Sequence, residues 1–241
     1  MLSSMYSALA FVPLSTVCQR EQLTDLQGRL ELVEANSGGN VNHVHLLRKW
    51  LSNPRLASIE IIQMPNFFST TSDLKPKENS HYQTIMTTFL HVSRGSVHIA
   101  SSDPLAPPEI DPGYLKDPIN LDALLSAVGF MQKVLSSEPF RSAASGISAC
   151  DPPNAVQSDE AIREWCRLRV EPLAHPVASA PMFPKEDGGV VDATLKVYGT
   201  KNLRVVDASI LPFELSCHIQ STVYAIAQKA ADIIKASCVK Y

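Results

Sequence analysis

The sequence predicts an α+β fold in which an antiparallel sheet, backed by helices, occupies residues 21–187 and a mixed C-terminal segment follows. Three observations support this prediction. Segments rich in β-branched residues gather between residues 58 and 100. The stretch from residue 103 to residue 118 holds five prolines and Gly113, which is typical of an extended loop. After this loop, helical periodicity appears over residues 121–135, 158–169 and 221–234.

The strand candidates lie in the first hundred residues. Residues 58–64, 84–92 and 95–100 mix β-branched with polar side chains, and the last of these segments alternates. Before them, residues 41–50 have the pattern of a short helix that ends at Asn53-Pro54. Residues 1–20 are apolar with few charges, so we expect a core segment that leads into the sheet domain.

The helix candidates carry recognisable start signals. Asn120 is the expected N-cap of a helix whose leucine and valine residues fall on one face through residue 135. Ser158, with two acidic residues after it, opens a second helix that runs to Arg169. Ser221 is the expected N-cap of the final helix. Between them, residues 190–191 and 203–206 read as short buried strands.

Composition narrows the range of partners. The chain has 241 residues, of which 45% are hydrophobic and 19% charged, and its net charge is −3. No basic field indicates nucleic acid or an anionic membrane as a partner. No run of about 18 apolar residues indicates a transmembrane helix. The apolar start has neither the basic residues nor the cleavage site of a signal peptide, which favours a cytoplasmic protein if Met1 is the true start.

Motifs for metals and phosphates are missing from the sequence. The five cysteines form no C-x-x-C pair, and His43 and His45 have no H-E-x-x-H context, so we expect no metal site. The sequence has no G-x-G-x-x-G and no P-loop, so this chain lacks the usual cradle for a pyrophosphate. His218 is more suggestive, because it stands just before the start of the final helix, where partial positive charge suits a developing anion.

The segments around His175 and His218 resemble the C-terminal signature of the glucose-methanol-choline (GMC) oxidoreductases, in order and in spacing. The matching stretches are His175-Pro-Val-Ala-Ser-Ala-Pro-Met182, Pro184-Lys-Glu-Asp-Gly-Gly-Val-Val-Asp192, Leu203-Arg-Val-Val-Asp-Ala-Ser209 and His218-Ile-Gln-Ser-Thr-Val-Tyr-Ala-Ile-Ala-Gln. Earlier, Ser93-Arg-Gly-Ser-Val97 is similar to a strand of that family's substrate domain. The resemblance implies an entering segment at 1–20, a substrate-binding domain at 21–187, and the C-terminal part of an FAD-binding domain at 188–241.

The resemblance also implies roles for single residues. The residue that matches His175 is the general base for an alcohol, whose hydride goes to FAD, and the residue that matches His218 hydrogen-bonds the same oxygen. The cofactor contacts that it implies are Asp207, Ala208, Ile219 and Gln220.

Two departures from the family pattern stand out. Ala178-Ser179 replaces the usual Gly-Thr, which adds a Cβ where the backbone of the family approaches closely or takes a positive φ. The glycine-rich N-terminal half is absent from this chain, and without it we expect the segment after residue 188 to expose apolar edges.

Three functions are compatible with this sequence. The first is oxidation of a small-molecule alcohol with FAD, in the manner of fungal enzymes that tailor polyketide-like secondary metabolites. It implies either a missing N-terminal half or a homo-oligomer as partner. The second is a flavin-independent cyclase, dehydratase or isomerase that uses the same two histidines. The third is a non-catalytic remnant or binding module, whose interface would be the apolar segment at residues 8–14.

Overall fold

The computed structural model describes residues 8–36, 41–64, 84–89, 92–138, 140–143 and 158–238. These residues form two compact units, each assembled from separate stretches of the chain. One unit takes residues 1–29, 50–93 and 114–171, and the other takes residues 30–49, 94–113 and 172–241. The domain boundaries predicted after residues 20 and 187 stay predictions.

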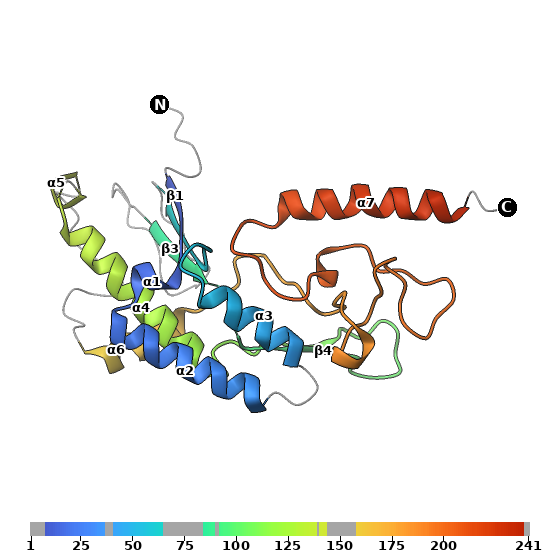
Figure 1. The fold of residues 1–241 in the computed structure, drawn as a ribbon, viewed down its shortest axis with the longest axis horizontal. Helices are drawn as coiled ribbons and strands as arrows, with labels where there is room; N and C mark the ends of the chain where they lie inside the picture. The colour runs from blue at the N-terminus through green and yellow to red at the C-terminus, as the bar shows by residue number, and fades with distance from the viewer. Residues whose placement is uncertain are drawn as a thin grey trace. The chain divides into compact units, whose positions relative to one another are not determined.

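The first unit is built on a three-stranded antiparallel sheet (Figure 1). Its strands are β1 (Ala8–Val12), β2 (Ile59–Met64) and β3 (Thr84–Phe89), in that spatial order. The register places Ala10 opposite Ile61 and Ile61 opposite Thr87. The predicted strand at 58–64 is therefore confirmed, as is the described part of the strand at 84–92. The first twenty residues were expected to be core, but in the edge strand β1 the side chains of Leu9 and Phe11 are each 44% exposed.

Five helices belong wholly or partly to this unit. They are α1 (Leu14–Val17), α2 (Arg20–Asn36), α4 (Pro118–Ser136), α5 (Phe140–Ala143) and α6 (Asp159–Arg169). The core lies between α4 and α6, where four aliphatic residues of α4 pack on Ile162 and Cys166. The start of α4 corrects our expectation. Asp117, and not Asn120, is the N-cap, because its Oδ1 accepts from the Ile119 amide at 2.9 Å. Asn120 is instead buried and its Oδ1 accepts from the Val92 amide at 2.9 Å.

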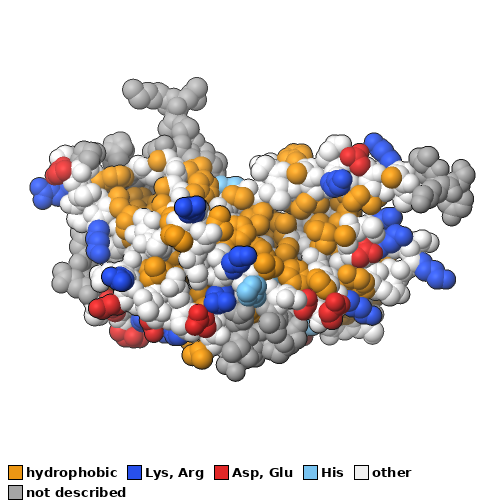
Figure 2. Space-filling view, viewed as in Figure 1, with side chains coloured by type: hydrophobic (Ala, Val, Ile, Leu, Met, Phe, Trp, Pro, Cys, Tyr) orange, Lys and Arg blue, Asp and Glu red, His pale blue; other side chains and the backbone are white. Residues whose placement is uncertain are grey.

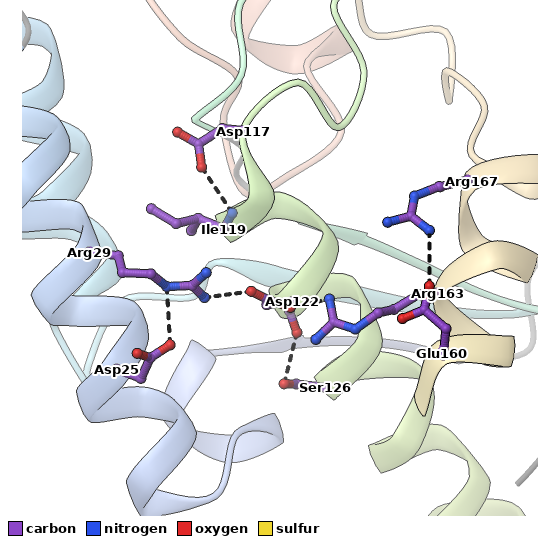
Figure 3. Close-up of polar contacts among 9 residues, drawn as sticks. All are labelled: Asp25, Arg29, Asp117, Ile119, Asp122, Ser126, Glu160, Arg163 and Arg167. Carbon is purple, nitrogen blue, oxygen red and sulfur yellow. Dashed lines mark hydrogen bonds and ion pairs between the residues drawn. The ribbon is translucent and has the colours of Figure 1, made fainter. Parts of the chain in front are cut away.

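A polar network joins three of these helices (Figure 3). Asp122 on α4 pairs with Arg29 of α2 and with Arg163 of α6, and Arg29 also reaches Asp25 at 3.0 Å. The predicted cap Ser158 is confirmed at the start of α6, where its Oγ accepts from the Ala161 amide at 3.3 Å.

The second unit contains α3 (Val41–Leu51) for most of its length, the hairpin of β4 (Ser96–His98) and β5 (Glu109–Asp111), and helix α7 (Gln220–Cys238). The predicted strands at 190–191 and 203–206 are reduced to isolated bridges, such as Val191 with Val197. Val191, Leu195, Ile210 and Ala230 form the core of this unit, so that α7 packs along the coil before it (Figure 1).

Apolar side chains also reach the surface of this segment (Figure 2). Leu203, Tyr224 and Ile234 are exposed, and Tyr224 most of all, at 72%. This agrees with the expectation that the segment after residue 188 exposes apolar edges. None of the described helices is both long and apolar enough to cross a membrane.

Candidate active site

The structure brings together the two histidines that the sequence singled out. The imidazole rings of His175 and His218 lie edge to face, with centroids 5.0 Å apart and planes at 85°. Both side chains are half-buried. Two imidazoles at this distance can share one small polar group of a ligand, such as a hydroxyl, and one of them can take a proton while the other donates a hydrogen bond.

His175 lies in a loop that has a left-handed residue on each side of it. Ala174 and Ala178 have φ values of +57° and +66°. Alanine in this conformation costs roughly 1 kcal/mol, because its Cβ crowds the carbonyl oxygen that follows. The sequence predicts that Ala178 carries a Cβ where the backbone approaches closely or takes a positive φ, and the structure gives this residue a positive φ. After this loop, the amides of Ala180 and Met182 donate to the carbonyls of Ser209 and Ile210, at 3.1 and 2.8 Å.

His218 stands two residues before helix α7. The helix begins at Gln220 and the Val223 amide donates to the Ile219 carbonyl at 2.9 Å, so Ile219 and not Ser221 holds the N-cap position. Ser221 lies within the first turn. The first amides of a helix have no acceptor within it and carry partial positive charge, so this end of α7 favours an electron-rich ligand group beside His218.

The four residues expected to contact a cofactor divide between two local structures. Asp207 caps the short helix Ala208–Ile210 and its Oδ1 accepts from the Ser209 amide at 2.8 Å. The Ser209 carbonyl accepts from the Ala180 amide, so this turn adjoins the segment that directly follows the His175 loop. Ile219 and Gln220 lie at the start of α7, where Ile219 is buried and Gln220 is exposed.

Sequence reasoning predicted no contact between two further residues of the same unit, His43 and Arg94. His43 on α3 is only 6% exposed, and its Nε2 lies 2.8 Å from Arg94 Nη1 and 3.0 Å from the Pro212 carbonyl oxygen. Burial lowers the pKa of the Arg94 guanidinium from its ordinary value. Both side chains line a pocket of about 110 Å³ together with Phe183 and Asp187. His43 and His45 belong to one helix, and their spacing gives no signal that His43 contacts the Pro212 carbonyl, which lies far along the chain.

Comparison with known proteins gives this geometry its context. Residues 91–227 match the family model described as GMC oxidoreductase. A GMC oxidoreductase family protein of Malassezia sympodialis, Mala s 12, is 43% identical over 145 residues, which are 59% of this chain and 23% of that protein. The dehydrogenase mpl7 of Monascus purpureus is 30% identical over 98% of this chain and 40% of its own length. The chain thus spans less than half the length of these relatives.

The solved structures agree with the fold described above. The structure of a fungal aryl-alcohol oxidase superimposes with a TM-score of 0.76 at 27% identity and covers 96% of this chain and 39% of its own. The predicted α+β class, with helices and small antiparallel sheets, is confirmed by this match.

Proposed function

Because the chain belongs to the GMC oxidoreductase family, we propose that it supplies the histidine pair of an FAD-dependent oxidoreductase that oxidises the alcohol of a small molecule. The observation that carries the proposal is the contact between His175 and His218, whose ring centroids lie 5.0 Å apart. The two residues come from separate loops of the chain, and the fold brings their imidazole rings into edge-to-face contact.

The two histidines take complementary parts in this proposal. His175 accepts the proton of the substrate hydroxyl as the carbon–hydrogen bond breaks. His218 donates a hydrogen bond to the same oxygen and so holds the substrate in one orientation. The start of α7 adds partial positive charge next to His218 and stabilises negative charge that develops nearby.

The residues present fit the end of FAD that carries the flavin ring. Ile219 and Gln220 would hold the ring, and Asp207 and Ala208 would hold the ribityl chain and phosphate next to it. The first amides of α7, which have no acceptor within the helix, are donors suited to an electron-rich ring edge. The carboxylate of Asp207 is already used by the Ser209 amide, so the turn offers its backbone rather than that charge. Bound FAD supplies the hydride acceptor for alcohol oxidation.

The proposed substrate is a small organic alcohol of fungal secondary metabolism, of polyketide-like size. Support comes from the fungal dehydrogenase and the aryl-alcohol oxidase among the similar proteins. An acid–base reaction without flavin uses the same two imidazoles and is the alternative that the experiment below separates.

The deciding experiment is the visible absorption spectrum of the chain after incubation with excess FAD and gel filtration. A retained flavin band, together with oxidation of an aryl alcohol coupled to a dye acceptor, supports the proposal. A folded, monodisperse and colourless protein contradicts flavin chemistry for this chain alone and favours acid–base catalysis.

The histidines are tested in the same assay. Replacement His175→Ala should lower kcat/KM by about 100-fold or more, since general acid–base catalysis contributes that much. The matched control is His98→Ala, because His98 is an exposed histidine of the same unit on β4. Equal activity of His175→Ala and the control would contradict the assigned role of His175.

A further inference from the structure

We propose that His43 and Arg94 form a positioning pair, which fixes the segment leading to His218 and ties it to the segment that follows His175. The catalytic consequence of this inference rests on the proposed function, whereas the structural part stands by itself. The contacts of the pair run to the backbone at Pro212 and to the rings of Phe183 and Phe213. Through these groups the pair acts on the placement of the two catalytic histidines.

His43 connects the two chain segments through its ring faces and edges. Its ring centroid lies 6.2 Å from that of Phe183 and 5.8 Å from that of Phe213, with interplanar angles of 65° and 62°. Edge-to-face contacts at such distances are attractive and set the relative orientation of the rings. Phe183 follows the His175 loop and Phe213 precedes His218, so one buried side chain of α3 contacts both segments.

His43, Arg94 and the Pro212 carbonyl form one polar cluster. His43 Nε2 lies 2.8 Å from Arg94 Nη1 and 3.0 Å from the Pro212 oxygen. A guanidinium only donates and a carbonyl only accepts, so Nε2 accepts from Arg94 in one tautomer and donates to Pro212 in the other. Arg94 Nη1 also donates to the Pro212 carbonyl at 3.3 Å, so Pro212 is held in either tautomer.

The backbone around Arg94 is tightly packed, so the Cα that carries this side chain has little freedom to move. Arg94 precedes the β4–β5 hairpin, where two glycines allow the strands' ends to approach closely. A Cβ on Gly95 would lie 2.1 Å from the Asp111 carbonyl oxygen, and a Cβ on Gly113 would lie 2.3 Å from the carbonyl oxygen of Arg94 itself. Gly113 also has φ +65°. The Arg94 side chain is therefore attached to a backbone of fixed position.

The segment that Arg94 and His43 hold has little regular structure of its own. Residues 212–219 lie between the short helix Ala208–Ile210 and α7, outside any helix or strand. A segment of this kind depends on side chains from elsewhere for its conformation. The pocket beside Arg94 holds about 110 Å³ and is also lined by Asp187, so it suits a few waters better than an anionic ligand.

The test uses amide hydrogen exchange of the full chain, which needs neither flavin nor turnover. In His43→Leu and in Arg94→Met, the amides of Ala180, Met182 and Leu211 should exchange about ten-fold faster. These amides donate to carbonyls of residues 208–210, and they lose the anchor at the neighbouring Pro212. Amides in the middle of α7 should change less than about two-fold. His98→Leu is the matched control and should leave both regions unchanged. His43→Gln, which keeps an acceptor for Arg94, should restore slow exchange.

A second readout is the nuclear Overhauser effect between the ring protons of His175 and His218. It should weaken in His43→Leu and recover in His43→Gln. Unchanged exchange at the amides of Ala180, Met182 and Leu211, or an equal increase over the whole unit, would overturn the positioning role. Should His43→Leu fail to fold, Arg94→Lys tests the same contact, because lysine lacks the fork that serves two acceptors. Loss of flavin chemistry would leave these outcomes intact, so the two proposals fail separately.

Discussion

The backbone is held in place by different interactions in the two compact units. In the unit made from residues 1–29, 50–93 and 114–171, helices α4 and α6 bury a continuous aliphatic cluster beside a three-stranded sheet. In the other unit, residues 181–211 contain two three-residue 3₁₀ helices and isolated bridges, but no α-helix and no strand. Single backbone hydrogen bonds, capped turns and close backbone approaches hold that stretch, and the two histidines of the pair flank it in the sequence.

The difference teaches where each unit is sensitive to mutation. A helical core spreads its stability over many apolar contacts, so one backbone substitution on a helix changes little. A coil segment that is held by a few single hydrogen bonds and close backbone contacts depends on each of them for its stability. Matched substitutions in the two units test this contrast, from the largest expected effect to the smallest.

The largest contrast is expected between two glycines. A Cβ on Gly189 would lie 1.8 Å from the Phe183 carbonyl oxygen, so Gly189→Ala must displace backbone and should cost about 3 kcal/mol or more. A Cβ on Gly129 in α4 would have nothing within 4 Å, so Gly129→Ala should instead stabilise by about 0.5–1 kcal/mol. Urea unfolding measures both. A tolerated Gly189→Ala would mean that the coil is not tightly specified.

The next effect concerns Asp122, which serves two arginines. Asp122→Asn should lower the free energy of unfolding by about 1–2 kcal/mol, because Arg29 and Arg163 lose a partly buried carboxylate (Figure 3). The control is Asp25→Asn, whose side chain is 66% exposed and should cost less than about 0.5 kcal/mol. Equal losses from the two substitutions would show that burial does not strengthen this network.

A smaller effect, of opposite sign, is expected in the His175 loop. Ala178 has φ +66°, so Ala178→Gly removes the Cβ clash and should stabilise by about 0.5–1 kcal/mol, after allowance for the greater freedom of glycine in the unfolded chain. Ala180 has no such φ, and Ala180→Gly should destabilise by a similar amount. Thermal unfolding separates the two. Destabilisation by both would mean that Ala178 is not strained.

The sequence could predict the regular elements with strong periodicity and little else. The face of α4 and the cap of α6 were predictable, because apolar spacing and Ser158 are local signals. Helix α2 was missed, since Gly28 and many polar residues weaken its pattern. The pairing of His175 with His218 entered through a family resemblance. The sequence presents His43 only as a possible metal ligand and does not predict its contact with Arg94, because such contacts join residues distant in sequence and no local pattern records them.

The smallest effect is a pH dependence in the coil. Asp192 Oδ1 accepts from the Thr194 hydroxyl at 2.7 Å and from the amides of Thr194 and Lys196, and these bonds hold the pKa of the carboxyl below its ordinary value of 3.8. A carboxyl whose pKa is lower in the folded state than in the unfolded state stabilises the folded protein at pH values above the unfolded pKa. This stabilisation disappears as the pH falls through the folded pKa.

The comparison with Asp192→Asn isolates this carboxylate, since asparagine keeps the acceptor oxygen and does not titrate. At neutral pH the natural protein should be more stable by less than about 0.5 kcal/mol, because solvent still reaches the half-buried side chain and screens its charge. The difference should shrink as the pH falls below 3.8, which urea titrations at several pH values can follow. A difference that stays constant with pH would mean that the oxygen atom alone holds the turn and that its charge contributes nothing.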